Sequence, residues 1–201
     1  MSSKPASTKV ERRRARRQKE RARNAIVDVA LGGVRLAMPG AGLCLPICVL
    51  LQRILAQSLP GSAFSLRLGS LQVHPQVGSA SVITFDPRTP EGIDGGFHAW
   101  LEDKGGKVLD PSIAVTLHDH GYDVDPNTYF LEGGRKFVRH GLLFIYEELP
   151  ELELIGVEES EPHLAALMAF ALQGEVPEPG RIHLDVRWRN SPTTPGTGGN
   201  E

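Results

Sequence analysis

The sequence is poor in cysteine, with only Cys44 and Cys48 among 201 residues. Their four-residue spacing puts both thiols on one face of a helix, where the geometry for a disulfide is poor. A disulfide framework is therefore excluded, and this cysteine usage suits a reducing compartment. A chain of this length favours one domain and can bury a core without disulfides or metals.

Long apolar runs are also missing. No stretch approaches the roughly 18 apolar residues needed to cross a bilayer. The first 24 residues lack the apolar segment and small-residue cleavage site of a secretory signal peptide. We therefore expect a cytoplasmic protein with no transmembrane segment.

Net charge is small, but it is unevenly distributed. The formal net charge is -2, yet residues 1–24 carry ten Lys or Arg and two Glu, a local charge of +8. Twelve basic and twenty-two acidic residues remain for the rest of the chain, a charge of -10. Residues 9–23 therefore suit contact with nucleic acid, an anionic membrane surface or an acidic partner, or form a solvated helix that folds back on the acidic region.

Three segments follow from composition. Residues 1–24 are predicted to form a basic, partly disordered N-terminal arm, and residues 25–189 a single domain. The tail over 190–201 is rich in Pro, Thr and Gly and is predicted to be disordered. One helix is expected from Val10 to Met38, ending near residues 39–40. Only its second half docks, through apolar residues at helical spacing: Ile26, Val29, Ala30 and Val34.

A second helix is predicted from Cys44 to the Pro-Gly pair at 60–61. Its apolar residues recur at three- and four-residue steps, which is typical of one buried face: Ile47, Leu50, Leu51, Ile54, Leu55 and Leu59. Cys44 lies at or just before the first turn, where the positive end of the helix favours a thiolate. Free backbone N–H groups there suit a developing oxyanion. The alternative is that Cys44 is a small buried hydrophobe.

Beyond residue 63 the pattern changes to short runs of period two. Strands are predicted over 64–69, 71–74, 81–85, 97–102 and 107–110, a strand or bent hairpin over 136–146, and a last strand over 181–188. A short helix is expected over 162–173, ended by Gly174. Helices first and strands later predict an α+β domain.

A hairpin centred on residues 104–106 brings two further chemical groups together. Residues whose numbers sum to about 208–210 face each other in such a hairpin, so Asp110 lies opposite the neighbourhood of His98. An Asp that orients a His, which in turn deprotonates a Cys, is the triad arrangement in its cysteine form. Cys48 competes with Cys44 for the role of nucleophile, although it lies one turn inside the helix.

The motifs G-x-C at the start of a helix, H-A-W-x-E and D-P-S occur in this order over about residues 40–115. The pattern resembles the transglutaminase-like (papain-type) cysteine enzyme superfamily, including the bacterial leader peptidases that process lasso-peptide precursors. The resemblance implies a core helix carrying the Cys, packed on an antiparallel sheet carrying His and Asp. It makes Cys44 the nucleophile, His98 the base and Asp110 the orienting acid, with Trp100 and Glu102 as supporting residues.

Other candidate sites are weaker. The run His118-Asp119-His120 has no matching Cys/His set, so we predict a solvated loop there and no metal or cofactor. The acidic block from Glu147 to Glu161 is predicted to be an exposed face.

The expected function is cysteine-dependent amide chemistry on a peptide or protein substrate. Peptide or isopeptide hydrolysis is its simplest form, and acyl transfer to an amine is a variant. The alternative is a non-enzymatic binding module on the same scaffold, with the basic arm contacting nucleic acid or a partner protein. An arylamine-type acetyltransferase fits less well, because enzymes of that type have longer chains and a different acidic motif.

Overall fold

The computed structural model describes residues 9–38, 43–59, 63–76, 83–91, 96–174 and 182–189. The predicted end of the first helix at residues 39–40 and the predicted disorder of residues 1–8 and 190–201 lie outside this range. The described helices are α1 (Lys9–Ala37), α2 (Cys44–Ser58), α3 (Ile113–Asp119) and α4 (Val157–Gln173). The described strands are β1 (Phe64–Pro75), β2 (Ile83–Phe85), β3 (His98–Asp103), β4 (Val108–Asp110), β5 (Phe130–Glu132), β6 (Lys136–Arg139), β7 (Leu142–Glu148), β8 (Leu152–Ile155) and β9 (Asp185–Trp188).

The strands form two antiparallel sheets. The larger has the order β5-β4-β3-β1-β7-β6, with β2 also paired to β1, and the smaller is the pair β8-β9. The predicted α+β class is therefore confirmed.

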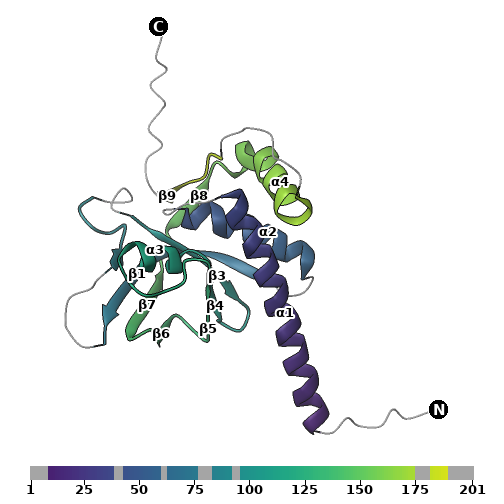
Figure 1. Ribbon diagram of the computed structural model, residues 1–201. Helices are drawn as coiled ribbons and strands as arrows, with labels where there is room; N and C mark the ends of the chain where they lie inside the picture. Colours follow the sequence, from purple (N-terminus) through teal and green to yellow (C-terminus); the bar gives the residue numbers. More distant parts are fainter. Residues whose placement is uncertain are drawn as a thin grey trace.

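Helices cover both faces of the larger sheet (Figure 1). Ala99, Leu101 and Leu109 face a core shared with α1, α2 and α4. Trp100 and Val108 point the opposite way, into a second core with α3. Strands β3 and β4 thus contribute to both cores, which fixes their position between the helices.

The buried residues of helix α1 lie in its second half. Val27, Ala30, Leu31 and Val34 are buried, whereas Val29 is 71% exposed. Val29 was therefore wrongly expected in the buried face: at 3.6 residues per turn it lies about 150° from the centre of the stripe that these four residues form, nearly on the opposite side of the helix. The first half of α1 extends beyond the rest of the domain (Figure 1).

Helix α2 begins at Cys44, as predicted. The expected apolar residues from Ile47 to Leu55 are buried, as are Leu45, Cys48 and Val49. Helix α2 is apolar nearly all round because it packs against α1, α4 and strands β1 and β3. This burial holds the first turn of α2, and with it Cys44, in a fixed position.

Strand β1 corrects one prediction, since two separate strands over 64–69 and 71–74 were expected. The chain instead runs straight through as one strand of twelve residues. Gly69 is needed for a close approach: a Cβ there would lie 1.9 Å from the carbonyl oxygen of Glu147 on β7. The glycine therefore serves strand pairing rather than a turn.

Of the two forms expected over 136–146, a strand or a bent hairpin, the structure shows the hairpin, made of β6 and β7. Its turn residues His140 and Gly141 both have positive φ, 51° and 72°, as a tight hairpin turn requires. Helix α4 ends at Gly174 as predicted but begins at Val157 rather than 162. Glu158 and Glu159 lie in its first turn, where carboxylates favour a helix N-terminus.

Candidate active site

Cys44 is the first residue of α2 and lies half-buried against a pocket of about 480 Å³. The helix has no side-chain cap at its N-terminus. The N–H groups of Cys44 and Leu45 belong to the first turn and have no carbonyl four residues back within the helix. Residue 46 is a proline and has no N–H. The thiol therefore lies beside two backbone donors and the positive end of the helix dipole.

His98 and Asp110 form a buried pair beside this thiol. The His98 Nε2 lies 2.6 Å from the Asp110 Oδ2, and the two side chains are 2% and 0% exposed. The hairpin pairs Leu101 with Leu109, whose numbers sum to 210, so the predicted register is confirmed. Asp110 then follows opposite Trp100, on the same face of the sheet as His98.

The Asp110 carboxylate is bonded through both oxygens. Oδ1 accepts hydrogen bonds from the backbone N–H and hydroxyl of Ser112, at 2.9 and 3.1 Å, and from the N–H of Ile113 at 3.0 Å. Oδ2 accepts a bond from the Tyr146 hydroxyl at 2.8 Å, besides the contact with His98. Burial alone would raise the pKa of Asp110, but the charge of His98 and these hydrogen bonds lower it below its usual value.

His98 is held in its charged form. Burial lowers the pKa of this imidazole, but the charge and hydrogen bond of Asp110 and the contact with Cys44 outweigh it and raise the pKa from 6.5 to about 10. Because Nε2 is bound to Asp110, Nδ1 is the ring nitrogen left to bond the Cys44 sulfur. A cation therefore lies beside the thiol at neutral pH.

Aromatic rings fix the orientation of His98. Phe85 stacks on the imidazole with centroids 5.5 Å apart, and Trp100 does so at 6.4 Å. Tyr146 completes the packing at 5.8 Å. Trp100 thus lies where a supporting residue was expected. Glu102 lies further along β3, and its carboxylate is 2.7 Å from the Nε of Arg135, whose guanidinium lies 6.0 Å from the Trp100 ring.

Cys48 lies in a different environment from Cys44. It is 0% exposed, and its thiol donates a weak hydrogen bond to the Ala99 carbonyl oxygen at 3.4 Å. Burial raises the pKa of the Cys48 thiol well above its usual value. Cys48 is therefore a neutral core residue, and of the two cysteines only Cys44 lines the pocket.

Tyr146 is a site residue that sequence reasoning missed. It lies in the Leu-Leu-Phe-Ile-Tyr run, which reads as an ordinary apolar strand. The pairing of β7 with β1, in which Tyr146 faces Leu71, carries it to within reach of Asp110. A pairing between residues 75 positions apart in the chain leaves no local signal in the sequence.

The pocket wall also draws on distant segments. Phe85 is the last residue of β2, and Phe97 comes directly before β3. Ile182, Leu184 and Asp185 come from the last described segment of the chain. Among the described residues the lining is mostly apolar, and Asp185 is the one carboxylate in it.

The run from His118 to His120 was the other candidate site in the sequence. The run His118-Asp119-His120 is exposed, as expected, but the predicted loop is wrong for its first two residues, because His118 and Asp119 form the end of α3 and only His120 follows the helix. Within the described ranges, no group of three or more His, Cys, Asp or Glu side chains is arranged to hold a metal ion. Among the same residues, no helix is long and apolar enough to cross a membrane.

No protein-family model matches the sequence, and no curated protein is similar to it. One solved structure, described only as a genomics target, is similar to this chain with a TM-score of 0.44 and 13% sequence identity. The similarity covers 85% of this chain and 92% of that one.

Proposed function

We propose that the protein is a cysteine-dependent enzyme of amide chemistry, with Cys44 as nucleophile, His98 as acid and base, and Asp110 as the residue that orients His98. The observation that carries the proposal is the buried His98–Asp110 pair, 2.6 Å apart, beside a half-buried cysteine at the start of a core helix. The proposal includes a papain- or transglutaminase-like scaffold and a reducing, cytoplasmic setting for the free thiol.

The first half of the reaction forms an acyl-enzyme. The Cys44 thiolate attacks the amide carbonyl carbon, and a C–S bond forms as the carbonyl oxygen becomes an oxyanion. The N–H groups of Cys44 and Leu45 stabilise that oxyanion. His98 then gives its proton to the amide nitrogen, and the C–N bond breaks. The amine departs, and the acyl group remains on Cys44 as a thioester.

The second half releases the acyl group. Neutral His98 takes a proton from a water molecule, and the resulting hydroxide attacks the thioester carbon. The C–S bond breaks, which restores the Cys44 thiolate and the His98 imidazolium. An amine in place of water gives acyl transfer by the same steps.

The pocket suits a peptide or protein substrate with an apolar side chain next to the scissile bond. Phe85, Phe97 and Leu184 offer apolar contact close to Cys44 and His98. Burial of one such side chain contributes roughly 1.5–3 kcal/mol to binding.

The test is activity against a library of unstructured peptides, followed by mass spectrometry, with Cys44→Ala compared with Cys48→Ala. Cys44→Ala should abolish cleavage or transfer and the covalent thioester adduct. Cys48→Ala removes a thiol outside the pocket and should retain activity. Turnover that survives in Cys44→Ala would overturn the proposal.

A further inference from the structure

The first half of α1 is a helix exposed along most of its length. Residues 9–22 are exposed, and the buried positions of α1 begin only at Val27. We call Lys9–Asn24 the basic half of α1. Its 16 residues span about 24 Å at the helical rise of 1.5 Å per residue. Figure 1 shows this segment extending away from both sheets.

The basic half carries an unusual density of charge. Seven Arg, two Lys and two Glu give it a net charge of +7, whereas residues 25–201 carry -10. Arg dominates, and its planar guanidinium binds phosphate oxygens through two parallel hydrogen bonds. The basic half therefore attracts a polyanion that the remainder of the molecule repels.

The charges surround most of the helix. At 3.6 residues per turn, the nine cations cover about 220° of its circumference. The remaining sector holds Glu11, Ala15, Gln18 and Ala22. A flat protein surface would contact the cations on one side of such a helix, whereas the floor and both walls of a groove would contact cations on three sides. The DNA major groove, about 12 Å wide, accepts a helix of about 10–12 Å diameter.

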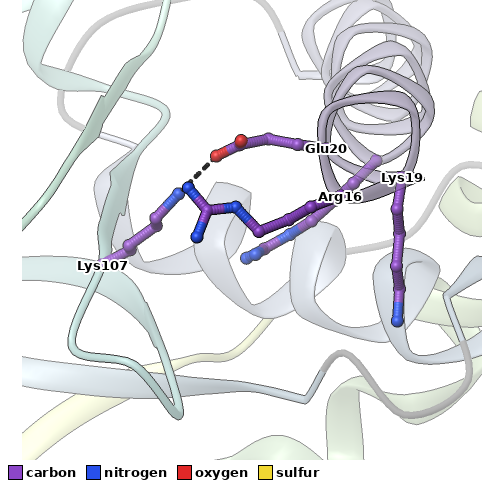
Figure 2. A pocket seen from close by; sticks show the side chains of 5 residues that line it. Arg16, Lys19, Glu20 and Lys107 are labelled. Atoms are coloured by element: carbon purple, nitrogen blue, oxygen red, sulfur yellow. Dashed lines mark hydrogen bonds and ion pairs between the residues drawn. The ribbon is translucent and has the colours of Figure 1, made fainter. Parts of the chain in front are cut away.

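The cationic surface continues from the C-terminal end of the basic half onto the domain. Arg16, Lys19, Glu20, Arg23 and Lys107 line a cleft of about 450 Å³, in which Lys107 comes from the turn between β3 and β4 (Figure 2). The Lys107 Nζ lies 2.8 Å from the Glu20 carboxylate. Arg23 is 2.9 Å from Asp103 and lies over the Phe64 ring, which fixes the angle at which the basic half leaves the domain.

Residue composition favours duplex DNA among the polyanions. Residues 9–24 include no aromatic residue, and single strands are bound largely by stacking bases on aromatic rings. The major groove of duplex RNA is too deep and narrow for side chains to read. A membrane-surface helix needs a continuous apolar face, and Val10 is the one large apolar residue in this segment.

We propose that the basic half of α1 binds the phosphate backbone of duplex DNA, lying along the major groove. The binding is electrostatic and independent of base sequence. This site is separate from the Cys44 pocket, so it stands or falls independently of the proposed enzymatic function.

The test is fluorescence anisotropy of a labelled mixed-sequence duplex of about 24 base pairs, titrated with the full chain at several salt concentrations. Apart from Arg12 and Arg23, the basic half has seven exposed cations. If each neutralises one phosphate, the slope of log K against log salt should be about -6. Affinity should therefore fall about a thousandfold or more between about 50 and about 200 mM salt.

Two variants of the same four positions separate charge from structure. Replacement of Arg13, Arg14, Arg17 and Arg21 by Gln should reduce the slope to about -3, while Lys at these positions should retain it. Cys44→Ala should bind DNA like the unaltered chain. Circular dichroism confirms that each variant is folded.

Three outcomes would overturn the proposal. The first is no binding to the duplex at about 50 mM salt, or a slope that the Gln variant leaves unchanged. The second is equal binding of single-stranded DNA of the same length. The third is displacement of the duplex by polyglutamate, or tighter binding to vesicles rich in phosphatidylserine, because either would assign the surface to another polyanion.

Discussion

Asp110 is the residue on which the site geometry depends. It links β4 to the start of α3 through Ser112 and Ile113, to β7 through Tyr146, and to β3 through His98. A carboxylate with all of these donors is fixed in position and charge. Its charge in turn keeps the imidazole protonated.

Asp110→Asn should lower the pKa of His98 far below about 10. The charge of Asp110 raises that pKa, and once it is removed the burial of the ring favours the neutral form. Titration of the histidine ring signals by NMR measures the change. A His98 midpoint that stays near pH 10 in the variant would contradict this assignment.

The same pair sets a pH window for stability. The pKa of His98 is raised, so its contribution is complete below about 6.5 and is lost as the pH rises through about 10. The pKa of Asp110 is lowered, so its contribution is present above about 3.8 and is lost on acidification. The His98–Asp110 pair therefore stabilises the fold most between about pH 3.8 and about pH 6.5, where both contributions are present.

Tyr146→Phe should lower the free energy of unfolding by about 1.5–3 kcal/mol, the usual worth of a hydrogen bond to a buried charge. It should also raise the pKa of Asp110 and slow alkylation of Cys44. Guanidinium denaturation and iodoacetamide kinetics measure the two effects. Tyr129→Phe is the control, since that hydroxyl bonds Asp28 instead of Asp110 and should leave the alkylation rate unchanged.

Two neighbouring glycines report on how the helices pack. A Cβ at Gly33 would lie 2.3 Å from the Ala171 carbonyl oxygen of α4, whereas one at Gly32 would meet nothing within 4 Å. Gly33→Ala should therefore lower the free energy of unfolding by about 1–3 kcal/mol. Gly32→Ala should raise it by up to about 1 kcal/mol, the difference in helix propensity.

Thermal unfolding of the two variants measures this contrast. Equal shifts in Tm for both, or stabilisation by Gly33→Ala, would show that α1 and α4 do not pack as closely as described.

Elements with a strong local pattern were predictable from the sequence. The apolar face of α2, the turn between β3 and β4 and the αL glycine after α4 are encoded by adjacent residues. The short α3, β5 and β8 were missed, because three to seven residues are too few for a period to emerge. The expected division of β1 into two strands was wrong, because the close approach of β7 to Gly69 cannot be read from the residues of β1 alone.

The candidate site divides in the same way. The proximity of His98 and Asp110 follows from one hairpin, so its register could be predicted. Tyr146 and the pocket wall from Ile182 to Asp185 could not be, since they reach the site through long-range packing. The buried state of Cys48 depends on the contact of α2 with Ala99, which the helix pattern alone does not specify.

The whole molecule has two electrostatic parts. A domain rich in carboxylates carries the Cys44 pocket, and the basic half of α1 leaves it at the Arg23–Asp103 ion pair. Removal of residues 1–22 retains that ion pair and takes away no buried residue of the described chain. The free energy of unfolding should therefore change by no more than about 1 kcal/mol.

Denaturation of the truncated chain checks this independence, with the rate of Cys44 alkylation as a second measurement. A loss of several kcal/mol, or a changed alkylation rate, would mean that the basic half supports the domain.

The most direct test of the central claim is the rate of Cys44 alkylation by iodoacetamide as a function of pH, read by peptide mapping. If the His98 cation activates Cys44, the folded protein should react at Cys44 much faster than at Cys48 near pH 6, where a free thiol is almost inert. His98→Gln should slow the reaction at pH 6 at least tenfold and have little effect near pH 10, where an ordinary cysteine thiol in water is already largely deprotonated. Equal rates at pH 6 for the two proteins, or preferential labelling of Cys48, would contradict the account.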